Sequence, residues 1–426
     1  MNYKEAWEYL DNLQFFKIKL GLESMAEFLG SVGNPQNKMR FVHVGGTNGK
    51  GSVSATLLTL LSEAGYKVGL YTSPHLSSVR ERFRINDTYI SENDFAEIAT
   101  RIKNTLSGTQ ITYFEFTTAL ALLWFEQQKV DLAVMEVGLG GRLDATNVIS
   151  PLVSVITNVS MDHEFHLGNT LTEVATEKAG IIKSGVPVVS GAEKNESGEV
   201  IQRTCLERGA RLLLLERDFG ANKQASDQWD YMGWNGLNLN KLPCHLKGQY
   251  QVGNAAMAIA ACECLREHGF QVDDDSFRSG LGKVRWPGRL EHFTLGTHRF
   301  LLDGAHNPAG IESLTSSLKE EFQYDKLICV WASMSDKDIS KTLRPMAPLC
   351  DHIIFTRPEA ERSALTEDLV QILPEEYRPR AKKVESVAAA LLEAQKMATP
   401  EDLICVAGSL YLIGAARKIL LGELVI

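Results

Sequence analysis

Residues 40–52 read Arg-Phe-Val-His-Val-Gly-Gly-Thr-Asn-Gly-Lys-Gly-Ser, and this stretch decides the fold. Its first five residues form a short β-type run, and residues 53–64 beyond it have a helical pattern. In such a loop, glycines let backbone N–H groups converge on phosphate oxygens, and the helix N-terminus adds a favourable field. The sequence therefore predicts a nucleotide phosphate loop made of Gly46, Thr47, Asn48, Gly49, Lys50, Gly51 and Ser52.

The loop departs from the strict Walker pattern at two positions. Val44 stands where that pattern has its first glycine, and Gly51 stands where it has a serine or threonine. Ser52 supplies a hydroxyl one residue late. The plainer interpretation is a glycine turn that feeds a helix. The Gly-Lys pair, the serine and the strand–loop–helix context favour phosphate binding, with Lys50 as a point charge on the phosphates.

Strands and helices alternate on both sides of this loop. Residues 67–71 are expected to form the next strand, and the near-continuous apolar runs at residues 131–137 and 152–157 are typical of parallel strands that are covered on both faces. Helical patterns occupy residues 116–127 and 248–268. The alternation predicts an α/β fold whose first sheet is mostly parallel.

A domain boundary is expected near residues 286–289, Trp-Pro-Gly-Arg, because the strand–helix alternation restarts there. We predict a P-loop NTPase-type domain over residues 1–290 and a smaller Rossmann-like α/β domain over residues 291–426. The polar region 218–240 is expected to be an irregular excursion.

The composition is that of an ordinary globular chain. Of 426 residues, 44% are hydrophobic and 23% are charged, and the net charge is −9, so we expect no nucleic acid partner. The N-terminal residues carry acids without a signal-peptide core, and no apolar run approaches the ~18 residues of a membrane span. The seven cysteines form no CxxC pair and suit a reducing compartment. We expect a cytoplasmic protein with no membrane partner.

Four polar positions follow predicted strands or lie in conspicuous motifs, and each also has a plain structural interpretation. Glu136 ends an apolar strand, which is where an α/β sheet holds Mg²⁺, yet strands often end in glutamate. His163 follows another strand, but a lone histidine is more often structural. Lys178 in Glu-Lys-Ala-Gly would ordinarily be solvated surface. Residues 303–308, Asp-Gly-Ala-His-Asn-Pro, suit a strand-to-helix turn.

Taken together in order, these segments resemble the folylpolyglutamate synthase/dihydrofolate synthase family, a branch of the Mur ligases. The resemblance runs through most of the chain. Its motifs are HVGGTNGKGS (43–52), GLYTSPHL (69–76), VMEVGLGGRLDATN (134–147), MDH (161–163), EKAGIIK (177–183), WPGRLE (286–291), DGAHNP (303–308) and AGSLYLIGAARK (407–418).

The resemblance implies an ATP-dependent acid–amino-acid ligase. Members phosphorylate a substrate carboxylate with ATP, and the amine of L-glutamate then attacks the acyl phosphate. Phosphorylation is needed because the oxide of a carboxylate is a very poor leaving group. The protein is then required mainly to position the reactants and to neutralise charge.

The resemblance also implies roles for individual residues. Lys178 would be carried as a carbamate, which turns a cation into a ligand for Mg²⁺. Lys50, Lys178 and His306 are the expected catalytic residues. The expected magnesium ligands are Ser73, Glu136, His163 and Lys178, and the further ATP contacts are Asn254, Arg289 and Asp303.

The expected folate-binding region comprises Tyr113, Phe114, Glu115, Asp144 and Ala145. An aromatic pair there would stack on a pterin, although core packing explains two aromatics equally well.

A segment near the N-terminus bears on which activities the chain has. Leu20 and Gly21 resemble the dihydropteroate-binding stretch of bifunctional members. We therefore expect glutamate addition both to dihydropteroate and to folates, with a monofunctional folylpolyglutamate synthase as the alternative. His306 and Ser409 are expected to handle glutamate. Members are usually monomers, so a monomer is expected.

Two other functions remain open at this point. A cell-wall Mur ligase shares the loop and the acyl phosphate chemistry, but the short segment before the loop leaves little room for a UDP-binding domain. A P-loop switch protein that reads guanine would carry Asn-Lys-x-Asp. The nearest string, residues 158–162, has valine in place of that lysine and one residue too many.

Overall fold

The computed structural model describes residues 1–13, 21–193, 195–223, 228–335, 337–358 and 362–422. These residues form two compact units, and each is described by itself. Unit 1 comprises Met1–Pro74, Val79–His245 and Gln251–Arg285, whereas unit 2 comprises His75–Ser78, Leu246–Tyr250 and Trp286–Ile426.

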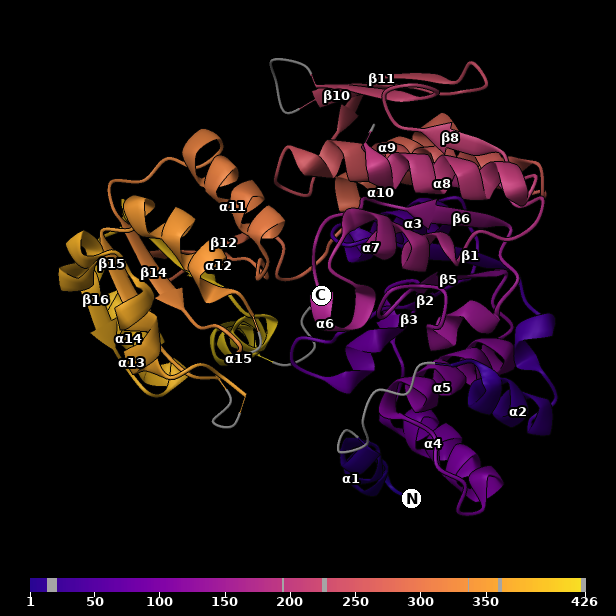
Figure 1. Cartoon of the computed structure of the whole chain (residues 1–426), viewed down its shortest axis with the longest axis horizontal. Helices are drawn as coiled ribbons and strands as arrows, with labels where there is room; N and C mark the ends of the chain where they lie inside the picture. The colour runs from indigo at the N-terminus through magenta and orange to yellow at the C-terminus, as the bar shows by residue number, and fades with distance from the viewer. Residues whose placement is uncertain (14–20, 194, 224–227, 336, 359–361, 423–426) are drawn as a thin grey trace. The chain divides into compact units, whose positions relative to one another are not determined.

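Unit 1 is built on a mostly parallel sheet with strand order β4-β3-β2-β5-β1-β6-β7-β8 (Figure 1). Five strand pairs of this sheet are parallel: β2–β5, β5–β1, β1–β6, β6–β7 and β7–β8. The β2–β3 and β3–β4 pairs are antiparallel. The strands are β1 (Phe41–Gly45), β2 (Val68–Tyr71), β3 (Phe83–Ile85), β4 (Thr88–Tyr89), β5 (Leu132–Glu136), β6 (Val153–Ile156), β7 (Val188–Ser190) and β8 (Leu212–Leu214).

Helices cover both faces of this sheet, which is why its central strands are mostly apolar. Alternate residues of β1 enter different cores: Val42 and Val44 pack with α3 and α9, and Phe41 packs with α4 and α5. The helices of this part of the chain are α1 (Tyr3–Asn12), α2 (Glu23–Ser31), α3 (Lys50–Glu63), α4 (Glu92–Leu106), α5 (Tyr113–Gln128), α6 (Glu164–Leu167), α7 (Leu171–Ala179), α8 (Glu196–Glu207), α9 (Tyr250–Arg266) and α10 (Asp274–Lys283).

The expectation of an irregular excursion at residues 218–240 is wrong. The described residues there belong to an antiparallel sheet of order β11-β10-β9, with β9 (Gly220–Lys223), β10 (Gln228–Met232) and β11 (Asn238–Pro243). Trp229 and Tyr231 of β10 are fully buried, whereas the residues between and beside them are not. The sheet buries one face only, so its sequence is polar overall.

Unit 2 is a second α/β layer arrangement with strand order β12-β13-β17-β14-β15-β16. Only the β12–β13 pair is antiparallel among the pairs described. Its strands are β12 (Glu291–Leu295), β13 (His298–Leu302), β14 (Leu327–Trp331), β15 (His352–Phe355), β16 (Ala381–Lys383) and β17 (Leu403–Ala407). Its helices are α11 (Pro308–Glu320), α12 (Ile339–Met346), α13 (Thr366–Ile372), α14 (Val387–Met397) and α15 (Leu410–Leu421).

The predicted fold class is confirmed: the two large sheets are mostly parallel, and each carries helices on its two faces. In an open sheet of this kind, ligands bind outside the carboxyl ends of the strands. Among the described helices, none is long and apolar enough to cross a bilayer.

Candidate active site

The glycine loop joins the end of β1 to the start of α3, and two of its glycines are required by their surroundings. Gly46 has φ +136°, and a Cβ there would lie 1.9 Å from Oγ1 of Thr157. Gly49 has φ +82°, and a Cβ there would lie 2.7 Å from Oδ1 of Asn254. A side chain at either position would meet both backbone strain and a steric clash.

The segment after β6 holds the loop in place. Thr47 N donates to the carbonyl of Asn158 at 3.0 Å, and Asn48 N donates to Asn158 Oδ1 at 2.9 Å. Thr157 Oγ1 donates to the carbonyl of Asn48 at 2.6 Å. These contacts fix the backbone before any ligand arrives, so little ordering remains to be done when a phosphate binds.

Two lysines converge on this loop. Lys50 Nζ donates to the carbonyls of Gly46 and Thr47 at 3.1 and 2.9 Å, and Lys178 Nζ donates to the carbonyl of Gly46 at 2.9 Å. Lys178 is buried, which contradicts its plain interpretation as solvated surface. Burial, with a smaller contribution from the nearby Lys50 charge, lowers the pKa of Lys178 to about 7, whereas Asp162 opposes the shift.

The candidate magnesium ligands come from several elements. Glu136 is buried at the end of β5, and its Oε2 accepts a hydrogen bond of 3.2 Å from Ser73 N. The parallel pairing of β2 with β5 brings these two residues together. His163 is exposed and precedes α6, with its ring 4.0 Å from the carboxylate of Asp162. In the described residues, no three His, Cys, Asp or Glu side chains form a ready metal site.

The candidate folate-binding residues at the start of α5 have local structural partners. Glu115 is buried and forms a capping box with Thr112, and it also accepts a hydrogen bond from Ser24. The ring of Phe114 lies where a Cβ of Gly138 would be, at 2.4 Å, so that glycine admits the ring. Tyr113 lies under the guanidinium of Arg82 at 5.3 Å.

Asp144 precedes the 3₁₀ helix η4 (Ala145–Val148), which begins with Ala145. Its carboxylate is buried and accepts hydrogen bonds from the backbone N–H groups of Gly138, Leu139 and Thr146 and from the Thr146 hydroxyl. Burial raises the pKa of Asp144 above its ordinary value, and these hydrogen bonds offset part of that rise. The side chain that the sequence assigns to folate binding therefore organises its own loop.

Near the N-terminus, Gly21 has φ +147°, and Leu20 lies outside the described residues. In unit 1, Asn254 is buried beside Gly49 and donates to Gln251 Oε1 at 2.9 Å.

The remaining candidates lie in unit 2, near the carboxyl ends of its strands. Asp303 is buried and accepts from Leu290 N at 2.8 Å and from Ala305 N at 2.9 Å. Burial raises the pKa of Asp303 above its ordinary value, and the charge of Arg289 offsets part of that rise. His306 Nδ1 lies 2.8 Å from the carbonyl of Gly304. Ser409 is buried at the start of α15, and its hydroxyl has no partner within the described part of the chain.

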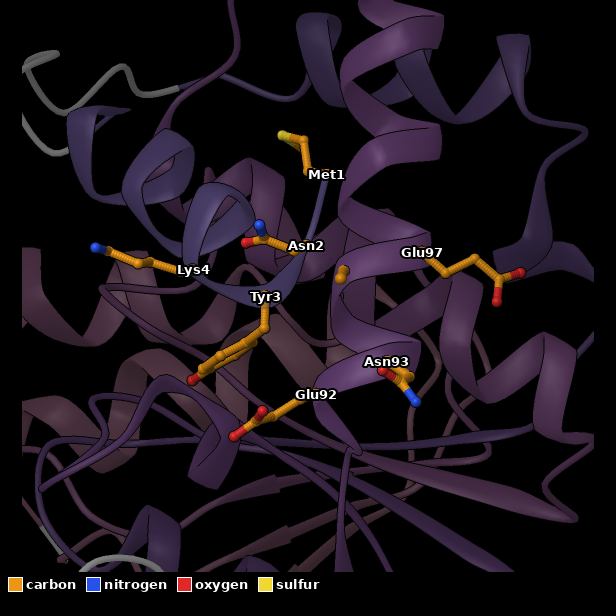
Figure 2. A pocket seen from close by; sticks show the side chains of 8 residues that line it. Met1, Asn2, Tyr3, Lys4, Glu92, Asn93 and Glu97 are labelled. Atoms are coloured by element: carbon orange, nitrogen blue, oxygen red, sulfur yellow. The ribbon is translucent and has the colours of Figure 1, made fainter.

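A pocket of about 560 Å³ elsewhere in unit 1 contains none of the predicted site residues. Figure 2 shows Lys4, Glu92 and Glu97 around it. The pocket is open and its lining carries both signs of charge, so it does not select one ligand chemistry.

Sequence reasoning missed several residues that shape the site. Thr157 and Asn158 hold the glycine loop, and their only sequence signal is their place directly after an apolar strand. His43 is fully buried inside β1, where a polar residue in an apolar run could have drawn attention.

Two family profiles match the chain. Residues 44–262 match the one described as Mur ligase middle domain, and residues 288–410 match the one described as Mur ligase, glutamate ligase domain.

Known proteins are similar over nearly the whole length. The dihydrofolate synthase/folylpolyglutamate synthase of Bacillus subtilis is 34% identical over 98% of both chains. The structure of Mycobacterium tuberculosis folylpolyglutamate synthase complexed with ADP and AMPPCP superposes with a TM-score of 0.90 at 29% identity, covering 98% of this chain and 99% of that one. The structure of Escherichia coli FolC in complex with DHPP and ADP has a TM-score of 0.88 at 32% identity, covering 98% and 97%.

Proposed function

The chain belongs to the dihydrofolate synthase/folylpolyglutamate synthase family of Mur ligases, and from this membership we propose that it joins L-glutamate to dihydropteroate and to folate polyglutamates with ATP. The observation that carries the proposal is the anchored glycine loop with Lys50 and Lys178 on its carbonyls. The loop supplies backbone N–H groups and positive charge where phosphate oxygens bind.

The proposed chemistry proceeds in two steps. An oxygen of the acceptor carboxylate attacks the γ-phosphorus of ATP, and ADP leaves. The amine of glutamate then attacks the acyl carbon, phosphate leaves, and the amine nitrogen loses a proton. Lys50 would stay on the phosphates through the first step, because its charge offsets the charge that spreads over the transferring oxygens.

Ser73, Glu136, His163 and Lys178 would hold Mg²⁺ in this proposal. The buried Glu136 carboxylate beside Ser73 fits a hard cation, which prefers oxygen ligands and keeps several waters. When bound, the ion would neutralise phosphate charge. We propose further that Lys178 is carbamylated: its neutral amine adds CO₂ and loses a proton. The burial that lowers the pKa of Lys178 to about 7 favours the neutral amine that this addition needs.

The substrates would be divided between the two parts of the sequence. Residues 1–290 would bind ATP, with Asn254 beside the loop, and the pteridine acceptor. Residues 291–426 would serve glutamate ligation. The acceptor contacts proposed are Leu20, Gly21, Tyr113, Phe114, Glu115, Asp144 and Ala145. Arg289 and Asp303 are proposed as further contacts of ATP.

Ser409 and His306 would take part in binding glutamate. The support is the buried Ser409 hydroxyl at the start of α15, since a helix N-terminus favours a carboxylate. We also propose that the enzyme is a cytoplasmic monomer without nucleic acid or membrane partners. Sedimentation tests the monomeric state, and cell fractionation tests the cytoplasmic location.

Isotope transfer tests the proposed chemistry. With ¹⁸O in the acceptor carboxylate, the mechanism places one ¹⁸O in the released phosphate, because that oxygen bridges carbon and phosphorus in the acyl phosphate. Turnover with unlabelled phosphate would exclude the acyl phosphate. ADP release that requires a UDP-muramyl peptide instead of a pteridine acceptor would favour the cell-wall Mur ligase.

A further inference from the structure

A histidine without a role in the proposed chemistry lies at the centre of the unit 1 sheet. His43 is the third residue of β1, in register with Met135 of β5 and Ser154 of β6, and it is fully buried. A buried imidazole costs free energy unless its polar atoms are satisfied. Its contacts therefore show what the residue does.

His43 starts a chain of hydrogen bonds that leaves the strand. Its Nε2 lies 2.8 Å from Thr146 Oγ1, which in turn donates to Asp144 Oδ1 at 2.5 Å. Asp144 Oδ2 accepts from Gly138 N at 3.0 Å and from Leu139 N at 2.9 Å. The chain thus connects the middle of β1 with the turn that directly follows Glu136.

The donors and acceptors of this chain have a single consistent arrangement when Asp144 is a carboxylate. The threonine hydroxyl has one proton, and the short contact with Asp144 uses it. His43 must then donate from Nε2, which leaves Nδ1 as a bare acceptor. Nδ1 has no hydrogen-bond partner among the described residues, and a bare lone pair suits that position better than a buried N–H.

An acid–base role for His43 is excluded by its environment. Burial, with a smaller contribution from the Lys183 charge, lowers the pKa of His43 to about 3. The ring is therefore neutral at physiological pH. Its contribution is geometric.

The turn that receives this chain contacts two parts of the candidate site. Gly138 lies against the ring of Phe114, as its missing Cβ would fall 2.4 Å from that ring. Arg142 N donates to the carbonyl of Glu177 at 2.8 Å, next to Lys178 on α7. A shift of the turn would displace the proposed folate contact and the proposed carbamate lysine.

We propose that His43 is a positioning residue that, through Thr146 and Asp144, holds residues 138–144 in the geometry needed to bind the acceptor substrate. The inference rests on the proposed function for its substrate, while the hydrogen-bond chain stands on the structure alone.

Paired substitutions test it. His43→Leu and Thr146→Val each break the chain at nearly constant volume. We expect each to raise the KM for dihydropteroate about tenfold, the size of effect seen when a residue that orients a ligand-binding group is removed, with the KM for ATP changed less than about twofold. His43→Gln keeps a donor near Nε2 and Thr146→Ser keeps the hydroxyl, so both should recover most of the loss. A double variant no worse than either single one would show that both act through one chain.

Hydrogen exchange provides a readout that needs no activity. Amides 138–144 should exchange faster in His43→Leu and Thr146→Val, but not in Thr342→Val, which removes a buried threonine hydroxyl of α12. Unchanged exchange and unchanged KM in Thr146→Val would overturn the proposal, as would full additivity in the double variant. A wild type without glutamate-dependent turnover would contradict the proposed function. The hydrogen-exchange comparison would still test whether His43 and Thr146 hold residues 138–144.

Discussion

At the scale of single residues, Lys178 has the largest consequences because its amine is buried beside a second lysine. Its pKa is lower in the folded chain than in the unfolded chain, so the unfolded chain binds the extra proton from about pH 7 upward. The free energy of unfolding should therefore rise with pH above about 7, until the unfolded lysine also loses its proton. Activity should also rise as the pH increases through about 7, because only the neutral amine forms a carbamate.

Lys178→Met tests both statements. Turnover should fall below detection, whereas the free energy of unfolding at pH 7 should stay equal or increase, because a buried cation is removed. Urea unfolding across pH measures the free energy of unfolding, and ¹³C-bicarbonate NMR detects the lysine carbamate. An active variant, or a wild type without a lysine-dependent carbamate signal, would contradict the carbamate proposal.

Gly46 is the second residue whose replacement has a sharp expected result. Gly46→Ala adds left-handed strain to a clash with Thr157 and should cost roughly 2–4 kcal/mol of folding free energy. Gly65→Ala is the matched control: its φ is +89° but no atom lies within 4 Å of the added Cβ, so only strain of about 1–2 kcal/mol remains. Equal losses in the two variants, measured by urea unfolding, would show that the Thr157 contact does not matter.

At the scale of elements, the sheet of β9–β11 is joined to α9 by a buried carboxyl. Glu263 accepts a hydrogen bond from Tyr231, and burial raises the pKa of Glu263 to about 7, with the nearby charge of Arg266 acting the other way. A carboxyl whose pKa is higher in the folded chain stabilises the fold below its unfolded value and loses that contribution as pH rises through about 7.

Glu263→Gln should remove this pH dependence. The amide keeps an acceptor for Tyr231 without a titrating charge. The free energy of unfolding of the variant should therefore increase by about 2 kcal/mol relative to that of the wild type as the pH rises from 5 to 8. Glu207→Gln on the exposed side of α8 serves as the control and should leave the pH profile unchanged. Parallel profiles for wild type and Glu263→Gln would contradict the assignment.

The strands of unit 1 differ in how well the sequence predicted them. Strands β1, β5 and β6 were predictable because burial on both faces makes most of their residues apolar. β9 to β11 were missed because they bury one face, and the Trp229–Tyr231 alternation is short and interrupted by a bulge.

For the site, chain order predicted the glycine loop, but proximity of distant residues had no local signal. The contact of Lys178 with Gly46 spans 132 residues, and the contact of His43 with Thr146 spans 103. Both depend on how the strands and helices pack, which composition and periodicity do not specify. The burial of Lys178 is the clearest case, since a lysine in a helix usually reads as solvated surface.

At the scale of the whole molecule, nucleotide binding should appear as global stabilisation. ATP with Mg²⁺ at a hundred times its Kd should add about 2.7 kcal/mol to the free energy of unfolding, because it binds the folded chain only. Lys50→Ala should lose most of this gain at the same ATP concentration, whereas Lys319→Ala on the exposed side of α11 should keep it. Thermal unfolding with and without ATP measures it, and equal shifts in both variants would contradict the placement of Lys50 on the phosphates.

The most direct test of the proposed function is product mass spectrometry of the full chain with ATP, Mg²⁺, L-glutamate and either dihydropteroate or tetrahydrofolate. We expect dihydropteroate to gain one glutamyl residue and tetrahydrofolate to gain one or more, and we expect neither product with Lys178→Met. Unmodified pteridine acceptors, together with an amino acid added to a UDP-muramyl peptide, would contradict the proposed function.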